Sequence, residues 1–211
     1  GMTTAQIAAL TPGQVASLTS AQVNALQSAQ VTALSRAAVS AMGTLQIAAL
    51  NTANVVGLTT AQIVGFGAGQ IAAFDTQDLA RLGSAQIQAI SVAGLAGLST
   101  QQIGSLTSSN ISRLSTLQVS SLSTAQVRAI EGQDLPGLTS AQMGALSAVQ
   151  TAALSTAQMA ALGTLQVSGI STAGFAGLGS AQVAALTTAN VGGLTRVQLG
   201  ALSATQIGSI E

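Results

Sequence analysis

The chain has 211 residues, which is enough for one or two ordinary domains with a sizeable hydrophobic core. Only 5% of these residues are charged, against roughly 25% in typical soluble domains, and five arginines balance five acids. A chain of this composition lacks the basic surface that attracts nucleic acids and anionic lipids, so we expect no nucleic-acid partner.

Large apolar residues recur at every eighth position from the N-terminus onward. The first series runs from Met2 to Ile210 without an insertion or a deletion, and a second series lies five positions later, from Ile7 to Ile207. Within each octad, position two is usually Ser, Thr or Gly, position five is Gln in 18 of 26 octads, and position eight is mostly Ala, Gly or Ser. This regularity predicts a single array of 26 octapeptide repeats over residues 2–209.

The beginning of each octad predicts the start of a helix. Ser or Thr at position two and Gln at position five form a capping box, in which the hydroxyl accepts from the third helical N–H and the Gln side chain accepts from the N–H of the capping residue. The apolar residues at positions one and six have the spacing of a hydrophobic staple. Pro12 follows Thr11 at the first helical position, where its missing N–H costs nothing. Small residues at position eight, often Gly, are typical of a helix end.

These signals predict an all-α solenoid, or superhelix, of very short helices, with one helix in each eight-residue repeat. One continuous helix is disfavoured, because eight residues overshoot two turns by about 80° and the apolar stripe would wind around the axis. A β-solenoid is the alternative, although Ala and Gln favour helix over strand. Isolated helices below about 12 residues are marginal, so the octads must stack, and two octads per coil is the simplest arrangement.

A longer period, equal to five octads, lies on top of the octad. Four octads spaced by this period lack Gln at position five and have Gly at position eight; they begin at Leu50, Ile90, Ile130 and Ile170 and end at Gly57, Gly97, Gly137 and Gly177. Duplication of a block of five octads would explain the period. Alternatively, five octads make a near-integral number of coils, which would give these sites a common environment.

The acids form two pairs at positions two and five of their octads. Asp75 with Asp78 and Glu131 with Asp134 could be read as paired carboxylates or as a site for a hard metal ion. We prefer helix capping, because acids at a helix N-terminus interact favourably with its dipole. Arg81 follows Asp78 by three residues, which predicts a surface ion pair of little energetic value.

The chain lacks the residues on which catalysis and metal binding usually depend. It contains no His and no Cys, and nothing in it could activate the many Ser and Thr hydroxyls. We therefore expect that it is not an enzyme, that it has no catalytic, cofactor-binding or metal site, and that it needs no cofactor. Polar residues interrupt every apolar run well before the roughly 20 residues of a membrane span, so we expect none. Residues 1–20 show no signal peptide, and Gly1 directly before Met2 is typical of the scar left by removal of an affinity tag.

Two resemblances to known repeats concern the octads themselves. Residues 18–25 (LTSAQVNA) and 178–185 (LGSAQVAA) resemble the octapeptide-repeat tracts of large repetitive bacterial surface and adhesin-like proteins, and this resemblance covers the whole chain. In such proteins the arrays are taken to be stalks or spacers, which implies an extracellular or cell-surface location. Residues 10–15 (LTPGQV) also resemble the helix start of TAL-effector DNA-binding repeats. That family has a longer period, a base-reading dipeptide and basic residues, none of which is found here.

The sequence favours a structural role, as a spacer or scaffold segment of a larger, exported bacterial repetitive protein. One alternative is a protein- or glycan-binding solenoid that presents the variable position seven along one face. Ice or surface binding by regular rows of Ser and Thr is a third. The terminal octads look like interior ones and have no polar capping repeat, so apolar ends could drive end-to-end self-association. No specific partner is identified by the sequence.

Overall fold

The computed structural model describes residues 1–210, and over these residues the chain forms short helices and no strand. Each octad contributes one element, which is an α-helix of four to six residues in 23 octads and a 3-10 turn in the other three. The all-α solenoid of one very short helix per repeat is thereby confirmed. The strands that a β-solenoid requires are absent from the described part of the chain.

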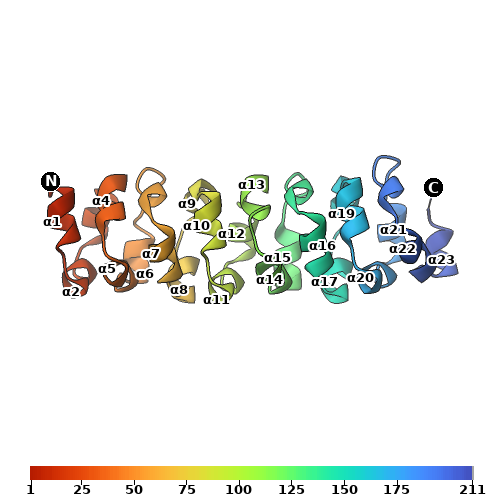
Figure 1. Ribbon diagram of the computed structural model, residues 1–211, viewed down its shortest axis with the longest axis horizontal. Helices are drawn as coiled ribbons and strands as arrows, with labels where there is room; N and C mark the ends of the chain where they lie inside the picture. The colour runs from red at the N-terminus through yellow and green to blue at the C-terminus, as the bar shows by residue number, and fades with distance from the viewer. Residues whose placement is uncertain (211) are drawn as a thin grey trace. The chain divides into compact units, whose positions relative to one another are not determined.

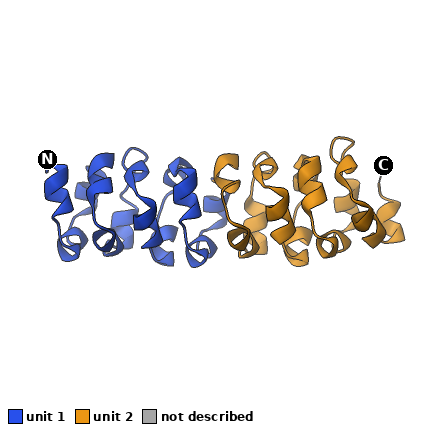
Figure 2. Cartoon of the chain, viewed as in Figure 1, with its two compact units in different colours: residues 1–105 blue, residues 106–211 orange. Residues whose placement is uncertain are grey.

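Contacts divide the protein into two compact units, Gly1–Ser105 and Leu106–Glu211 (Figure 2). The first unit contains α1 (Thr4–Ala8), α2 (Pro12–Ala16), α3 (Ser20–Asn24), α4 (Ser28–Ala33), α5 (Arg36–Ser40), α6 (Thr44–Ile47), η1 (Val55–Gly57), α7 (Thr60–Val64), α8 (Ala68–Ala72), α9 (Thr76–Arg81), α10 (Ser84–Gln88), α11 (Val92–Ala96) and α12 (Thr100–Gly104). The second unit contains α13 (Ser108–Ile111), α14 (Thr116–Ser120), α15 (Thr124–Ala129), η2 (Leu135–Gly137), α16 (Ser140–Ala145), α17 (Ala148–Ala152), α18 (Thr156–Ala161), α19 (Thr164–Gly169), α20 (Thr172–Ala176), α21 (Ser180–Ala184), η3 (Val191–Gly193), α22 (Arg196–Ala201) and α23 (Ala204–Ile207).

Within each unit, every helix packs against the helix three octads further along the chain (Figure 1). In the first unit α1 contacts α4, α2 contacts α5 and α3 contacts α6; in the second, α16 contacts α19, α17 contacts α20 and α18 contacts α21. Three octads therefore make one coil, and the prediction of two octads per coil is wrong. Five octads amount to one and two-thirds coils, so the prediction that the five-octad period spans a near-integral number of coils is wrong as well.

An extended N-cap residue precedes each α-helix. At the end of α4, for example, Leu34 has φ −61° and ψ 138°, and the capping residue Ser35 has φ −67° and ψ 153°. The helix closes with a 3.2 Å hydrogen bond from the Leu34 N–H to the Val31 carbonyl. This break turns the chain so that positions one and six both face the interior, where Leu34 and Val39 are buried. The predicted interruption of the helix at every cap is confirmed.

The three 3-10 turns lie in octads whose position five is Asn or Asp, one methylene shorter than Gln: Asn54, Asp134 and Asn190. All three of these octads also end in Gly. Asn110 and Asp78 are the instructive exceptions, because their octads end in Arg113 and Arg81 and keep the short α-helices α13 and α9. A 3-10 turn therefore requires both the shorter side chain and the glycine.

The glycines at the end of these turns are needed for space, not for an unusual backbone conformation. Gly at position eight does lie at helix ends, as at Gly97 and Gly177, and no described residue has a positive φ. A Cβ on Gly137 would lie 2.6 Å from the carbonyl oxygen of Ser108 in the preceding coil, and Gly57 and Gly193 make the same kind of approach. A Cβ on Gly177 would meet nothing closer than 3.4 Å. The four glycines of the five-octad period thus fall into two classes.

Replacing Gly137 by Ala should destabilise the protein, whereas replacing Gly177 by Ala should be neutral or slightly stabilising. In the first variant the backbone of two coils must separate, at a cost of about 1–3 kcal/mol for an overpacked contact. In the second, Ala has the better helix propensity and adequate room. Urea denaturation followed by circular dichroism measures both, and equal effects of the two substitutions would contradict the assignment.

Candidate functional site

The capping boxes form as the sequence predicts. In α3 the N–H of Thr19 donates to Oε1 of Gln22 over 2.8 Å, and the N–H of Gln22 donates to the Thr19 hydroxyl over 3.2 Å. Where Gly takes position two, the hydroxyl half is lost but the Gln half persists, as in the 2.8 Å bond from the Gly43 N–H to Oε1 of Gln46. The oxygen of the Gln amide thereby accepts from the N–H of the capping residue at nearly every helix start.

The nitrogen of the same amide joins each helix to the preceding coil. Nε2 of Gln158, at the start of α18, donates to the carbonyls of Val127 at 3.1 Å, Arg128 at 3.3 Å and Ile130 at 2.8 Å. These carbonyls lie at the end of α15 and at its junction with the octad of η2, on which α18 packs. The Val127 carbonyl also accepts from the Ile130 N–H at 3.3 Å. A single side chain therefore caps the N-terminus of its own helix and the C-terminus of the helix four octads earlier.

This bond recurs with a fixed register through both units. The Gln nitrogen reaches the carbonyl of the position-one residue at that junction at 2.6–2.8 Å. In most octads it also reaches a carbonyl at position six or seven of the helix before the junction, as Gln46 does with Val15 and Ala16. The Gln residues that make the bond are Gln30, Gln46, Gln62, Gln70, Gln86, Gln102, Gln142, Gln150, Gln158, Gln166, Gln182, Gln198 and Gln206. We call these bonds the inter-coil amide network; Asn54 and Asn190 take part through Nδ2.

The inter-coil half of this network was missed by sequence reasoning, although a signal was present. A capping box accepts Glu or Gln at its third helical position, because only an acceptor oxygen is needed there. No octad has Glu at position five. The preference for Gln over Glu is the signal that the nitrogen of the amide matters as well as its oxygen.

Asp78 is a buried acid at a position that holds an amide in most octads. It occupies position five, where Gln would donate to the carbonyl of Leu50, and it is only 1% exposed. Neither of its carboxylate oxygens has a hydrogen-bond partner. Burial, with a smaller contribution from the negative charge of Asp75, raises the pKa of Asp78 to about 6. The predicted surface ion pair with Arg81 is not formed, since Arg81 is exposed and the carboxylate is buried.

The remaining acids divide between capping and other contacts. Asp75 caps α9 as predicted, by accepting from the N–H of Asp78 at 2.8 Å. Capping by Glu131 and Asp134 is wrong: their octad forms the 3-10 turn η2, and the Glu131 carboxylate instead accepts from Nε2 of Gln133. Within residues 1–210 no three acids approach one another closely enough to hold a metal ion.

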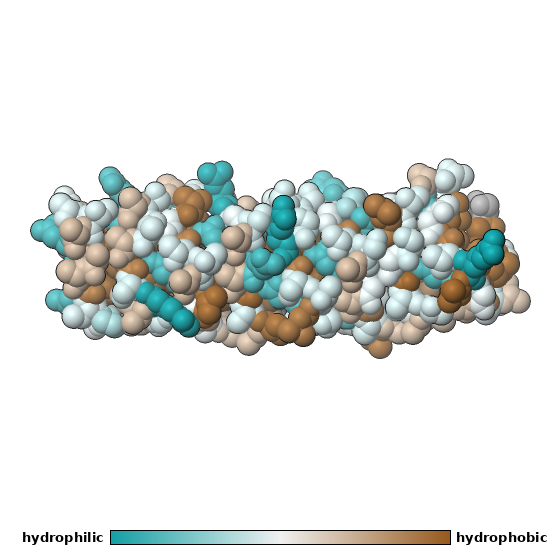
Figure 3. All heavy atoms as spheres, viewed as in Figure 1, coloured by the Kyte–Doolittle hydropathy of each residue, from teal (hydrophilic) through white to brown (hydrophobic). Residues whose placement is uncertain are grey.

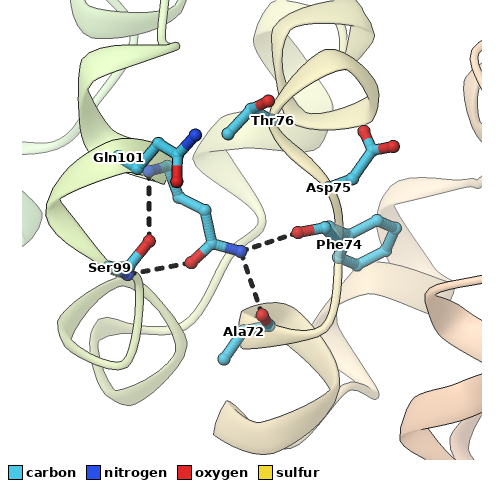
Figure 4. A pocket seen from close by; sticks show the side chains of 7 residues that line it. Ala72, Phe74, Asp75, Thr76, Ser99 and Gln101 are labelled. Atoms are coloured by element: carbon cyan, nitrogen blue, oxygen red, sulfur yellow. Dashed lines mark hydrogen bonds between the residues drawn. The ribbon is translucent and has the colours of Figure 1, made fainter.

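A pocket of about 410 Å³ lies between the starts of α9 and α12 (Figure 4). Its lining contains the amide of Gln102, which donates to the Ala72 carbonyl at 2.9 Å and the Phe74 carbonyl at 2.6 Å and accepts from the Ser99 N–H at 2.8 Å. The Asp75 carboxylate at its rim is engaged as a cap. The pocket is therefore a groove between successive coils whose main polar groups are already paired.

The surface offers little charge. On the face shown in Figure 3, strongly hydrophilic and hydrophobic residues lie scattered among weakly polar ones. The exposed large apolar side chains include Leu45, Leu117, Val149, Leu165 and Val197, all at position four of their octads. None of the helices in residues 1–210 has the length and apolar character needed to cross a membrane.

Repeated short helices, stacked three to a coil and joined by side-chain amides, define an α-solenoid repeat protein. The family model of the ALTTAQ repeat matches residues 1–36, 39–76, 71–108, 127–164 and 164–196. These matches cover more than half of the chain, which therefore belongs to the ALTTAQ repeat family. The six letters of the family name correspond to octad positions eight and one to five, and so include the Gln of the inter-coil amide network. None of the curated proteins matches the chain.

Replacing Gln158 by Glu should be costly, whereas replacing Gln22 by Glu should not. Glu can still cap its own helix, but it cannot donate to the carbonyls of α15, and it leaves a buried carboxylate; the expected cost is about 3 kcal/mol. Gln22 is exposed and its Nε2 has no acceptor among the described residues, so Glu there should be neutral. Chemical denaturation gives the global effect.

Hydrogen exchange separates the two roles of the amide in the Gln158→Glu variant. We expect the N–H of Ser155 to stay protected, because its acceptor oxygen remains, while the last turn of α15 exchanges faster. Unchanged protection of α15 would mean that Gln158 acts as a cap alone.

Replacing Asp78 by Gln should stabilise the protein at pH 7.5 by about 1–3 kcal/mol, because an unpaired buried group is removed and the inter-coil donor is restored. The pKa of Asp78 rises from 3.8 to about 6 on folding, so folding takes up a proton. The stability of the natural chain should consequently increase as the pH falls from about 7 through 6 toward 4.

The pH dependence of the melting temperature checks this assignment. The Asp78→Gln variant should lose the rise between pH 7 and pH 4, and the matched variant Glu131→Gln, at an exposed acid, should keep it. A natural chain whose melting temperature falls steadily over that range would show that Asp78 is not the controlling group.

Proposed function

We propose that the chain is a structural spacer or scaffold segment of a larger, exported repetitive bacterial protein. The observation that carries this proposal is the fixed register of the inter-coil amide network. Because the same donor meets the equivalent carbonyls of the preceding coil throughout both units, each three octads add an equivalent layer to their unit. A uniform increment of length is what a spacer needs, and it requires no catalytic or ligand-binding group.

The surface composition supports the same role. Exposed positions are mostly Ala, Ser, Thr, Gly and Gln, and only 5% of the chain is charged. Hydroxyl and amide groups keep such a surface hydrated without attracting charged partners. The resemblance of the octads to tracts of bacterial surface proteins supports an extracellular or cell-surface location.

A binding solenoid is the second candidate, and one observation favours it. Leu45, Leu117, Val149, Leu165 and Val197 leave 66–79% of their surface exposed, which is unusual for side chains of this size in a sequence otherwise rich in Ala at position four. They could form contacts with a protein partner. Position seven, where the sequence suggested such contacts, holds mostly small residues. Ice binding has less support, because the hydroxyls at position two are used by helix caps.

The spacer role is tested by fusing a fluorescent protein to each end of the chain and changing the number of coils. Removal of residues 138–161, a complete coil, should raise energy transfer, and duplication of the same residues should lower it. A Gly/Ser linker of equal length is the control, because its end-to-end distance grows only as about the square root of residue number. Transfer that follows the flexible linker, or that ignores coil number, would rule out a spacer.

A further inference from the structure

The coil formed by residues 74–97 has a single amide at position five. Its three octads carry Asp78, Gln86 and Gly94 there, so Gln86 alone can take part in the inter-coil amide network. Nε2 of Gln86 donates to the Leu58 carbonyl of the preceding coil at 2.6 Å. The preceding coil comprises residues 50–73, and α9, α10 and α11 pack on its η1, α7 and α8. We call this interface the Asp78 seam.

Other coil interfaces of the protein are more completely bonded. In residues 50–73 every octad donates an amide bond to the coil before it, and residues 138–161 of the second unit do the same. The donors are Asn54, Gln62 and Gln70 in the first case and Gln142, Gln150 and Gln158 in the second. The Asp78 seam therefore keeps one position-five donor where these interfaces have three.

The two positions without an amide differ in what replaces it. At Gly94 the space is taken by apolar groups, since a Cβ there would lie 3.0 Å from Cγ1 of Ile71 and 3.2 Å from Cγ2 of Ile90. At Asp78 a carboxyl group takes the place of the amide. It is only 1% exposed, and neither of its oxygens has a hydrogen-bond partner within residues 1–210. The seam is thus closed by apolar packing around a buried carboxyl.

The surroundings of Asp78 offer no compensating positive charge within the described chain. From residue 37 to residue 112 the titratable residues are Asp75, Asp78 and Arg81. Asp75 adds a second negative charge on α9, and Arg81, at the other end of this helix, is exposed. The elements packed against α9 are η1 and α12, and neither contains a titratable residue. An ionised Asp78 therefore escapes the cost of burial in two ways, by taking up a proton or by reaching water.

We propose that the Asp78 seam is a pH-dependent opening point of the first unit. With a proton on Asp78 the carboxyl is neutral and has an O–H to donate, so the two coils stay packed. With the proton lost, the charge reaches water when the coils separate, and one amide of the network opposes that separation. The opening is local, because the next interface toward the N-terminus keeps all three of its amides.

The pH dependence has a defined sign. Burial raises the pKa of Asp78 from 3.8 to about 6 in the closed seam, and separation of the coils returns it toward 3.8. Closing therefore takes up a proton, and the seam closes more firmly as the pH falls from about 7 through 6 toward 4. These two pKa values correspond to an opening equilibrium constant that rises by about tenfold from pH 5 to pH 7.5.

Hydrogen exchange of the full chain at these two pH values tests the proposal, with each rate corrected for the intrinsic pH dependence of exchange. Residues 138–161 serve as an internal reference, because they contain no titratable residue and make all three amide bonds. Protection of residues 50–97 should fall by about tenfold from pH 5 to pH 7.5 relative to this reference.

Two kinds of variant separate the carboxyl from the amide. Asp78→Gln and Asp78→Asn both remove the titrating group, so residues 50–97 should keep the same protection at pH 5 and pH 7.5. Gln86→Ala should increase opening of the seam by about tenfold at both pH values and leave the pH response in place. Gln150→Ala is the matched control, because it should loosen residues 138–161 without changing residues 50–97.

Three results would overturn the proposal. One is a protection of residues 50–97 that changes with pH no more than that of the reference. The second is a pH response that persists in the two Asp78 variants, and the third is an effect of Gln86→Ala spread evenly over both units. The spacer role does not depend on this outcome, since it concerns coil number and not the opening of one interface.

Discussion

The fold depends on the primary amide at position five of most octads, which forms hydrogen bonds with two helices at once. A helix of five residues is nearly all terminus, since the first four N–H and the last four C=O groups of any helix lack partners within it. Short helices would therefore be costly to bury. The Gln at position five removes much of that cost, because its oxygen caps one helix and its nitrogen caps the end of a helix in the preceding coil. The two apolar series can then pack without leaving unpaired polar groups among them.

Amide hydrogen bonds also explain why the protein can be stable with so little charge. A carboxylate has no donor for the carbonyls of the preceding coil, and an ammonium has no acceptor for the N–H of the cap. The primary amides of Gln and Asn provide both groups on one side chain. Asp78 shows the consequence of an acid at this position: its octad keeps the helix and loses the inter-coil bond, and the cost appears as a buried carboxyl with a raised pKa.

The local part of this structure could be predicted from the sequence, and the packing of coils could not. Thr19 and Gln22 determine where a helix starts through interactions within one octad, so the pattern of residues was sufficient. The number of octads per coil could not be predicted in this way. Because the octads are nearly identical, their pattern of residues is compatible with any whole number of octads per coil. The pairing of octads between successive coils leaves a trace in the sequence only where the repeat is irregular. Gly137 is such a position, because it needs space against Ser108 in the preceding coil. Such a pair of distant positions cannot be recognised before the coil is known.

Those irregular octads show which element of the structure is fixed and which adapts. In Asn54 the side chain is shorter than Gln, yet its oxygen still accepts from the Asn51 N–H at 2.8 Å and its nitrogen still reaches the Val23 carbonyl at 3.2 Å. The backbone makes up the difference by tightening into a 3-10 turn and moving so close to Ser28 that only Gly fits at position 57. In this octad the α-helix is replaced by a 3-10 turn, and the hydrogen bond to the preceding coil is retained. The spacing between coils is therefore set by the reach of the amide network, and the helices are the part of the repeat that can change.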